Sequence, residues 1–150
     1  MGKKKIVKQS SSDALKQADK IQNAVARSKS KSVNKKLEHA KVYVSASYNN
    51  TSITVTNDKG DVVAWTTSGS LGFNGPKKST PFAASKIVAS IAEKLRKSNL
   101  RSIDIIVKGV GTGRDSAVRS LSNQGFDILS IKDVTGIPHN GPKPKKTRRV

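Results

Sequence analysis

The 150-residue chain contains no cysteine, and this absence removes several classes of protein at once. Without thiols there is no disulfide framework, no cysteine-based zinc ribbon or finger, and no cysteine nucleophile. No apolar run approaches the roughly 20 residues of a membrane span, and the N-terminus lacks the apolar core of a secretory signal. We therefore expect no membrane contact and a cytoplasmic protein. The N-terminus is Ser-rich and acid-poor like a transit peptide, but it carries lysine instead of arginine, so an organelle is the less favoured alternative.

Acidic residues are also scarce, since ten Asp and Glu face 29 Lys and Arg, for a formal net charge of +19. The basic excess is concentrated at the two ends. Residues 1–41 carry twelve basic and three acidic residues, and residues 138–150 carry five basic residues and no acid. A compact chain of this charge repels itself unless a polyanion neutralises it. The composition therefore predicts nucleic acid as the partner.

Aromatic residues make up only 4% of the chain, so extensive base stacking is not expected. Recognition should depend on the nucleic-acid backbone and its shape. We expect Trp65 and Phe73 to anchor the core or a loop.

Catalytic groups are poorly represented. A nuclease of the ribonuclease H type needs several carboxylates that converge on two metals. Here Asp58 and Asp61 lie in a turn, and Asp104 lies in a strand with no partner acid apparent from the sequence. His39 and His139 are far apart and have no ligand pattern near them. The sequence therefore predicts no enzyme, no metal, no cofactor and no small-molecule substrate.

The middle of the chain predicts an α/β domain with the element order β-β-β-α-β-α-β. Helical periodicity predicts one helix that begins at Pro81, after Thr80 as its N-cap, and a second helix at 114–124. A three-stranded meander followed by two right-handed crossovers gives a mixed five-stranded sheet of the ribonuclease-H-like type. The nearly continuous apolar run at 102–108 predicts a strand covered on both faces. Strands are expected at 42–47, 52–56, 62–67, 102–108 and 127–132.

This pattern divides the chain into a basic N-terminal extension at 1–40, the α/β domain at 41–137, and a basic tail at 138–150. The extension should be largely disordered, with one short amphipathic helix after Ser12 that presents Ala14, Ala18, Ile21 and Val25. The tail holds three prolines and almost no apolar surface. It gains little from packing on its own domain, so we expect it to be flexible until it binds a polyanion.

Two glycine-containing loops precede the predicted helices. Lys77 and Lys78 lie before a helix N-terminus, whose free N–H groups and positive dipole end favour phosphate; a capped helix with solvated lysines is the alternative. Gly109-Val-Gly-Thr-Gly113 superficially resembles a dinucleotide fingerprint, but Arg114 stands where that pattern needs glycine, and no P-loop lysine follows. We expect Arg114 and Arg119 to contact RNA backbone; a tight strand–helix turn is the alternative.

Several specific motifs occur together within residues 40–150. The most specific are Lys78-Ser-Thr-Pro-Phe-Ala-Ala84 and Ile137-Pro-His-Asn-Gly141. Further segments are Asn49-Asn50-Thr51, Trp65 with Ser68-Gly-Ser70, Gly72-Phe73, Val107-Lys-Gly109 with Gly111 and Gly113-Arg114, Asp133-Val-Thr135, and Arg148-Arg149-Val150. Together they resemble the family of small-subunit ribosomal protein eleven, bacterial type. The chain departs from the family's commonest residues at Gly136, Val110 and Thr112, where proline is usual, and at Pro142, where cysteine is frequent.

The resemblance implies a non-enzymatic constituent of the small ribosomal subunit that acts in translation. It implies a position on the platform, where the protein bridges helices of the small-subunit ribosomal RNA and borders the messenger-RNA (Shine-Dalgarno) cleft. It also implies the seventh and eighteenth small-subunit proteins as neighbours, and it assigns no role to residues 1–40. The residues expected at the ribosomal RNA are Asn49, Asn50, Thr51, Lys77, Lys78, Ser79, Thr80, Lys108, Arg114, Arg119, His139, Asn140, Lys143, Lys145, Lys146, Arg148 and Arg149.

Two alternatives from other classes stay open at this point. One is a basic DNA-compacting protein, which would bind duplex DNA as well as structured RNA. The other is a nucleotide-binding or nuclease enzyme, which would be stabilised by a nucleotide or a divalent metal.

Asn140 is followed by a glycine, which does not shield its own amide, so the Asn140 side chain can cyclise onto it. We hypothesise that Asn140 is converted to isoaspartate. An unmodified Asn140 in mass spectra of native material would exclude this.

Overall fold

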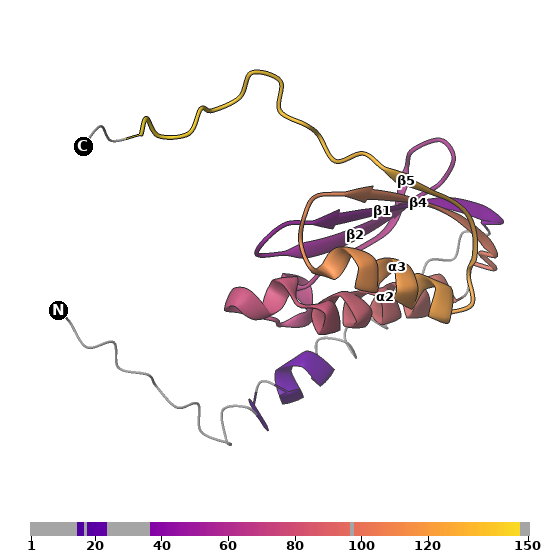
Figure 1. Ribbon diagram of the computed structural model, residues 1–150. Helices are drawn as coiled ribbons and strands as arrows, with labels where there is room; N and C mark the ends of the chain where they lie inside the picture. The colour runs from indigo at the N-terminus through magenta and orange to yellow at the C-terminus, as the bar shows by residue number, and fades with distance from the viewer. Residues whose placement is uncertain (1–14, 17, 24–36, 97, 148–150) are drawn as a thin grey trace.

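The computed structural model describes residues 15–16, 18–23, 37–96 and 98–147. A five-stranded mixed sheet with the order β3-β2-β1-β4-β5 packs against two helices (Figure 1). The strands are β1 (His39–Ala46), β2 (Thr51–Thr56), β3 (Val62–Thr67), β4 (Ser102–Lys108) and β5 (Asp127–Asp133), and the helices are α2 (Pro81–Leu95) and α3 (Gly113–Asn123). The predicted α/β class, mixed sheet and element order are confirmed.

The strand directions bring both helix N-termini to one end of the domain. β2 runs antiparallel to β1 and β3, whereas β4 runs parallel to β1 and β5. Four strands therefore point the same way, and the chain leaves β3 and β4 at the same end to enter α2 and α3. Two short 3-10 helices, η1 (Gly69–Leu71) and η2 (Gly75–Ser79), occupy the segment predicted as a loop before α2.

Both helices cover the same face of the sheet (Figure 1). In β4, Ile103, Ile105 and Val107 are buried, whereas Ile106 between them is only half-buried. The expectation that strand 102–108 is covered on both faces is therefore wrong. Both crossovers step across the sheet in the same direction, and right-handed crossovers of this kind place their helices on one side. We call the other side, with the odd-numbered residues 39–45 and the even-numbered residues 102–108, the open face.

The core lies between the covered face and the helices. The predicted stripe of α2 is confirmed, since Ala84, Ile87, Val88, Ile91 and Leu95 are all buried. Phe73 also joins the core, and its ring meets that of Phe82 edge-on at 6.1 Å. Trp65 does not, since it is 60% exposed. Side chains alternate along a strand, and Ala64 and Thr66 face the helices, so Trp65 stands on the open face.

The described part of the N-terminal extension packs on the domain at one point. Residues 15–16 and 18–23 are helical, as predicted. Ile21 is half-buried against the core beside Gly72, whereas Ala18 is exposed. Ser12, Ala14 and Val25 lie outside the described residues. No described helix is long and apolar enough to cross a membrane.

The folded domain begins before residue 41, where the sequence suggested a boundary. β1 starts at His39, and Ala40 is fully buried. The N–H of Leu37 donates to the carbonyl oxygen of Ser98 at 2.8 Å, and the N–H of Ser102 donates to that of Glu38 at 3.3 Å. Residues 37–40 are thus part of the central strand and of the contacts at its N-terminal end.

Two truncations should separate the extension from the strand. Deleting residues 1–40 should lower the free energy of unfolding by about 2 to 4 kcal/mol more than deleting 1–36, because it removes backbone hydrogen bonds and the buried Ala40. Urea unfolding of the two proteins measures the difference. Equal transition midpoints would show that 37–40 contribute nothing to the fold.

Candidate nucleic-acid interface

Four segments meet beyond the carboxyl ends of β1, β3, β4 and β5, and we call this region the loop end. Most of the residues predicted at the RNA lie in it or leave from it. Because β1, β3, β4 and β5 all point the same way, residues that are far apart in sequence share one end of the sheet. The loop end comprises residues 46–51, 68–80, 109–114 and 133–135.

Hydrogen bonds join these segments into one structure. Ser68 Oγ donates to Oδ1 of Asn50 at 2.6 Å. Thr112 Oγ1 donates to the carbonyl oxygen of Ser79 at 2.7 Å. The N–H of Gly109 donates to Thr135 Oγ1 at 3.0 Å, which ties the start of the C-terminal segment to the turn after β4. The loop end is therefore a connected surface and not a set of independent loops.

The glycine turn after β4 packs its backbone directly on the turn between β1 and β2. A Cβ atom on Gly109 would lie 2.1 Å from the carbonyl oxygen of Ala46, and Gly109 has a φ of +100°. A Cβ atom on Gly111 would lie 2.3 Å from the carbonyl oxygen of Ser47. Of the two interpretations left open by the sequence, this geometry supports a tight strand–helix turn. The glycines permit close approach of one backbone to another.

The three residues Asn49, Asn50 and Thr51 differ in exposure. Asn49 is exposed, and Asn50 is half-buried and bonded to Ser68. Thr51 has no exposed surface, and a Cβ atom on Gly113 would lie 2.5 Å from Thr51 Oγ1. A fully buried side chain cannot touch a polyanion. We therefore remove Thr51 from the candidate RNA contacts and assign it to the packing of the loop end.

Arg114 makes contacts within the chain. Its Nη1 atom donates to the carbonyl oxygen of Gly109 at 3.0 Å and to Thr135 Oγ1 at 3.3 Å, and its Nη2 atom pairs with the Asp133 carboxylate. Hydrogen bonds from the Thr135 hydroxyl and from Arg114 hold the pKa of the Asp133 carboxyl well below its usual range. The pair thus stays ionised in moderately acidic solution. Arg114 therefore links the end of β5 to the glycine turn. Its guanidinium is already bonded to groups of its own chain, and these bonds compete with the predicted contact with RNA.

The N-terminus of α2 offers fewer free amides than the sequence suggested. Thr80 is the N-cap, as predicted, and its Oγ1 atom accepts from the N–H of Ala83 at 3.3 Å. The N–H of Ala84 donates to the carbonyl oxygen of Thr80, and Pro81 has no N–H to offer. The first turn is therefore largely satisfied within the chain. An anion here would depend mainly on the neighbouring lysines.

The N-terminus of α3 is a weaker anion site. Gly113 is buried, and Asp115 places a carboxylate in the first turn. That negative charge opposes an anion at the positive end of the helix dipole. The geometry of α3 thus does not favour a phosphate at its N-terminus.

Exposed cations surround the loop end. Lys77 and Lys108 are exposed, whereas Lys78, Ser79 and Thr80 are half-buried. Arg119 is exposed on α3, where it and Arg114 line a shallow hollow of about 240 Å³ beside β5.

The described part of the tail continues from the loop end as an extended, fully exposed segment (Figure 1). His139, Lys143, Lys145 and Lys146 all face solvent, and Asn140 has a φ of +52°. No helix or strand occurs between residues 138 and 147. Arg148 and Arg149 lie outside the described residues. The predicted tail cations that the structure describes are therefore all available to an external polyanion.

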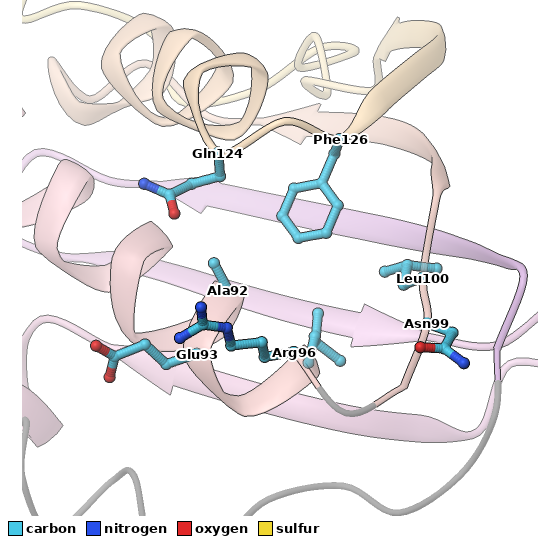
Figure 2. A pocket seen from close by; sticks show the side chains of 8 residues that line it. Ala92, Glu93, Arg96, Asn99, Leu100, Gln124 and Phe126 are labelled. Atoms are coloured by element: carbon cyan, nitrogen blue, oxygen red, sulfur yellow. The ribbon is translucent and has the colours of Figure 1, made fainter.

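A second hollow at the loop end, of about 330 Å³, is bordered by Ile21, Phe73 and Lys77, among others. A cavity of about 470 Å³ at the opposite end of the domain is bordered by Arg96, Leu100, Gln124 and Phe126, among others (Figure 2). Figure 2 shows that it lies between the last turn of α2 and the segment after α3, and it contains none of the predicted RNA-contact residues. Across the described ranges, no three His, Asp or Glu side chains are arranged to hold a metal ion.

Sequence reasoning missed one contact among the acids. His39 Nδ1 lies 2.8 Å from Asp58 Oδ1, and His39 Nε2 lies 3.3 Å from Asp104 Oδ2. The imidazole thus joins two carboxylates that appeared unrelated in the sequence. Since each ring nitrogen faces a different acid, the group does not converge on a common ligand.

The chain is similar in sequence to known proteins of one family. The sequence model described as "Ribosomal protein S11" matches residues 40–149. A Treponema pallidum (strain Nichols) protein named small ribosomal subunit protein uS11 is 46% identical over 126 residues, which are 84% of this chain and all of that protein. A protein of the same name from Helicobacter pylori (strain P12) is 46% identical over 85% of this chain and 97% of its own length. The uS11c protein of Oltmannsiellopsis viridis is 48% identical over 83% and 96%.

These matches define the class as structural ribosomal proteins and not enzymes. Within that class, the chain belongs to the ribosomal protein S11 family. The family model begins at residue 40, next to the start of β1, whereas the 126-residue match to the Treponema protein must also include part of the N-terminal extension.

Proposed function

We propose that this protein binds and bridges helices of the small-subunit ribosomal RNA on the platform of the small ribosomal subunit, in translation. The observation that carries the proposal is the convergence of the loop lysines and the basic tail at one end of the sheet. Lys77 and Lys108 face solvent there, and the tail continues from the same end. Cations grouped in this way can neutralise phosphates of RNA helices that would otherwise repel each other.

The proposal divides the residues in and around the loop end into three groups. Lys77, Lys78, Lys108, Arg119 and the tail cations contact RNA backbone. Arg114 and Thr51 act as positioning residues. Arg114 pairs with Asp133 and donates a hydrogen bond to Thr135, and Thr51 is buried. Polar contacts with RNA come from the parts of six further side chains that reach solvent: Asn49, Asn50, Ser79, Thr80, His139 and Asn140. The proposed RNA contacts are thus charged and polar side chains, and the positioning residues hold the scaffold that carries them.

The proposed location brings neighbours with it. On the platform the protein borders the messenger-RNA cleft and the seventh and eighteenth proteins of the small subunit. We propose the cytoplasmic ribosome as the compartment, with an organellar ribosome as the alternative. Relatives named uS11 and uS11c both match the chain, so their names support either ribosome.

Co-sedimentation tests the proposal directly. The purified protein should sediment with small ribosomal subunits that lack it, at moderate salt, and an excess of duplex DNA should not release it. Binding that duplex DNA competes away as well as ribosomal RNA does would favour a DNA-compacting protein. Failure to associate with small subunits at any salt concentration would exclude the proposed function.

A further inference from the structure

The open face of the sheet carries two exposed aromatic side chains. Trp65 on β3 is 60% exposed and Tyr43 on β1 is 39% exposed. Thr54 on β2 lies between them, since it pairs with Trp65 on one side and with Tyr43 on the other. The two rings therefore stand on one surface, two strand spacings or about 10 Å apart.

The same row across the sheet ends in a lysine. Tyr43 pairs with Ile106, and Ile106 pairs with Lys132 on β5. Lys41 and Lys108 project from the same face, each two residues along its strand from this row. Lys108 and Lys132 are exposed and Lys41 is half-buried. Within the part of the chain that the structure describes, none of these three lysines forms an ion pair.

The acids near this surface already have partners. Asp104 accepts a hydrogen bond from Ser130 Oγ at 2.7 Å and also lies beside His39, which contacts Asp58 as well. These groups lie toward the end of the sheet that is remote from the loop end, where Asp104 is the register partner of Lys41; Lys108 and Lys132 lie on the other side of Asp104, nearer the loop end. The unpaired charge around the aromatic rings is therefore positive.

We propose that the open face is a stacking platform for unpaired RNA bases. Trp65 and Tyr43 would each support one base, while Lys41, Lys108 and Lys132 would contact the adjoining phosphates. This inference rests on the proposed RNA-binding function and adds a second recognition mode, because the loop end contacts backbone and this face contacts bases. Lys108, the last residue of β4, directly precedes residues 109–114 of the loop end and so connects the two surfaces.

Two features favour RNA over a protein partner. Protein–protein interface cores are depleted in lysine, whereas aromatic rings bordered by cations are typical of single-stranded nucleic-acid sites. The separation of the rings also matters, because it is too wide for two bases in one continuous stack. It suits splayed bases of a loop or bulge, which are the parts of RNA that proteins stack upon.

Trp65 is the chain's only tryptophan, so its fluorescence reports directly on this face. Titration of the full-length protein with a short single-stranded oligoadenylate should quench the fluorescence, because a base stacks on the indole. An RNA duplex of equal length should bind through its phosphates without quenching. Tyr43→Ala should weaken oligoadenylate binding about tenfold and leave duplex binding unchanged.

Two variants serve as controls. Tyr43→Phe keeps a stacking ring and should bind oligoadenylate as the parent protein does. Val62→Ala truncates an exposed apolar residue on the same strand as Trp65 and should have no effect. Circular dichroism shows whether each variant is folded.

The outcomes distinguish this inference from the function on which it rests. If oligoadenylate binds without quenching and Tyr43→Ala has no effect, the platform is excluded while RNA binding by the loop end stands. If neither RNA binds, the proposed function fails first. If ultraviolet light crosslinks Trp65 to a protein instead of RNA in small subunits containing the chain, the open face is a protein-docking surface and the platform is excluded.

Discussion

Gly109→Ala should lower the free energy of unfolding by about 2 to 5 kcal/mol. The added methyl group meets the Ala46 carbonyl oxygen at 2.1 Å, and the φ of +100° is strained for any residue with a Cβ atom. Each of these effects alone is worth about 1 to 3 kcal/mol. Because the neighbouring atom is backbone at the end of β1, it cannot rotate away as a side chain would. Urea unfolding followed by circular dichroism measures the change.

Three other glycines separate the two causes. In Gly111→Ala the new Cβ atom meets a backbone oxygen at 2.3 Å, but the residue has no positive φ. In Gly125→Ala the new Cβ atom has no atom within 4 Å, but the residue keeps a φ of +84°. Gly136→Ala adds neither and should stay within about 0.5 kcal/mol of the parent protein. The expected order of destabilisation places Gly109 first and Gly136 last. If Gly109→Ala costs no more than Gly125→Ala, the two turns are free to separate and the loop end is not a fixed scaffold.

Local patterns in the sequence predicted the elements well. The strands at 62–67 and 102–108 agree with β3 and β4 to the residue, and Thr80 caps α2 as expected. These features depend on residues within a few positions of one another, so alternation, periodicity and capping chemistry suffice to locate them. The element order then determined the sheet, because right-handed crossovers leave few arrangements.

Contacts between distant segments were harder to predict. The sequence marked Arg114 as a phosphate ligand, yet the structure pairs it with Asp133. The Arg114–Asp133 pair could have been predicted from the topology, because parallel pairing of β4 and β5 brings the end of β5 beside the turn after β4. Trp65 was misplaced for a related reason. Its exposure depends on both helices sharing one face, which is a property of the whole fold.

The loop end shows why the charged residues could be located but not assigned a role. From the sequence, Lys77 and Arg114 look alike, because each is a cation near the N-terminus of a predicted helix. Only the folded structure shows that one faces solvent while the other clamps a carboxylate. Thr112 illustrates the same limit. Its hydroxyl donates to the carbonyl oxygen of Ser79, a hydrogen bond that a residue without a side-chain donor could not make at this position.

Neutralising the tail should have the largest effect on RNA binding. Changing Lys145, Lys146, Arg148 and Arg149 together to glutamine removes four cations from a segment with no packing role in the described residues. Each phosphate contact contributes roughly 0.7 to 0.9 to the slope of log affinity against log salt concentration. If all four contact phosphates, the slope should flatten by about three. Binding of small-subunit ribosomal RNA, measured over a series of salt concentrations, gives this slope.

A matched pair of double variants tests whether position matters or only charge. Lys145→Gln with Lys146→Gln removes two charges from the tail, and Lys59→Gln with Arg101→Gln removes two exposed charges from the end of the domain remote from the loop end. Both changes lower the net charge by the same amount, so long-range attraction falls equally. Only the tail pair should flatten the slope, by about 1.5. Equal slopes for the two variants would mean that RNA affinity responds to overall charge, and would contradict the proposed contact between the tail cations and RNA phosphates.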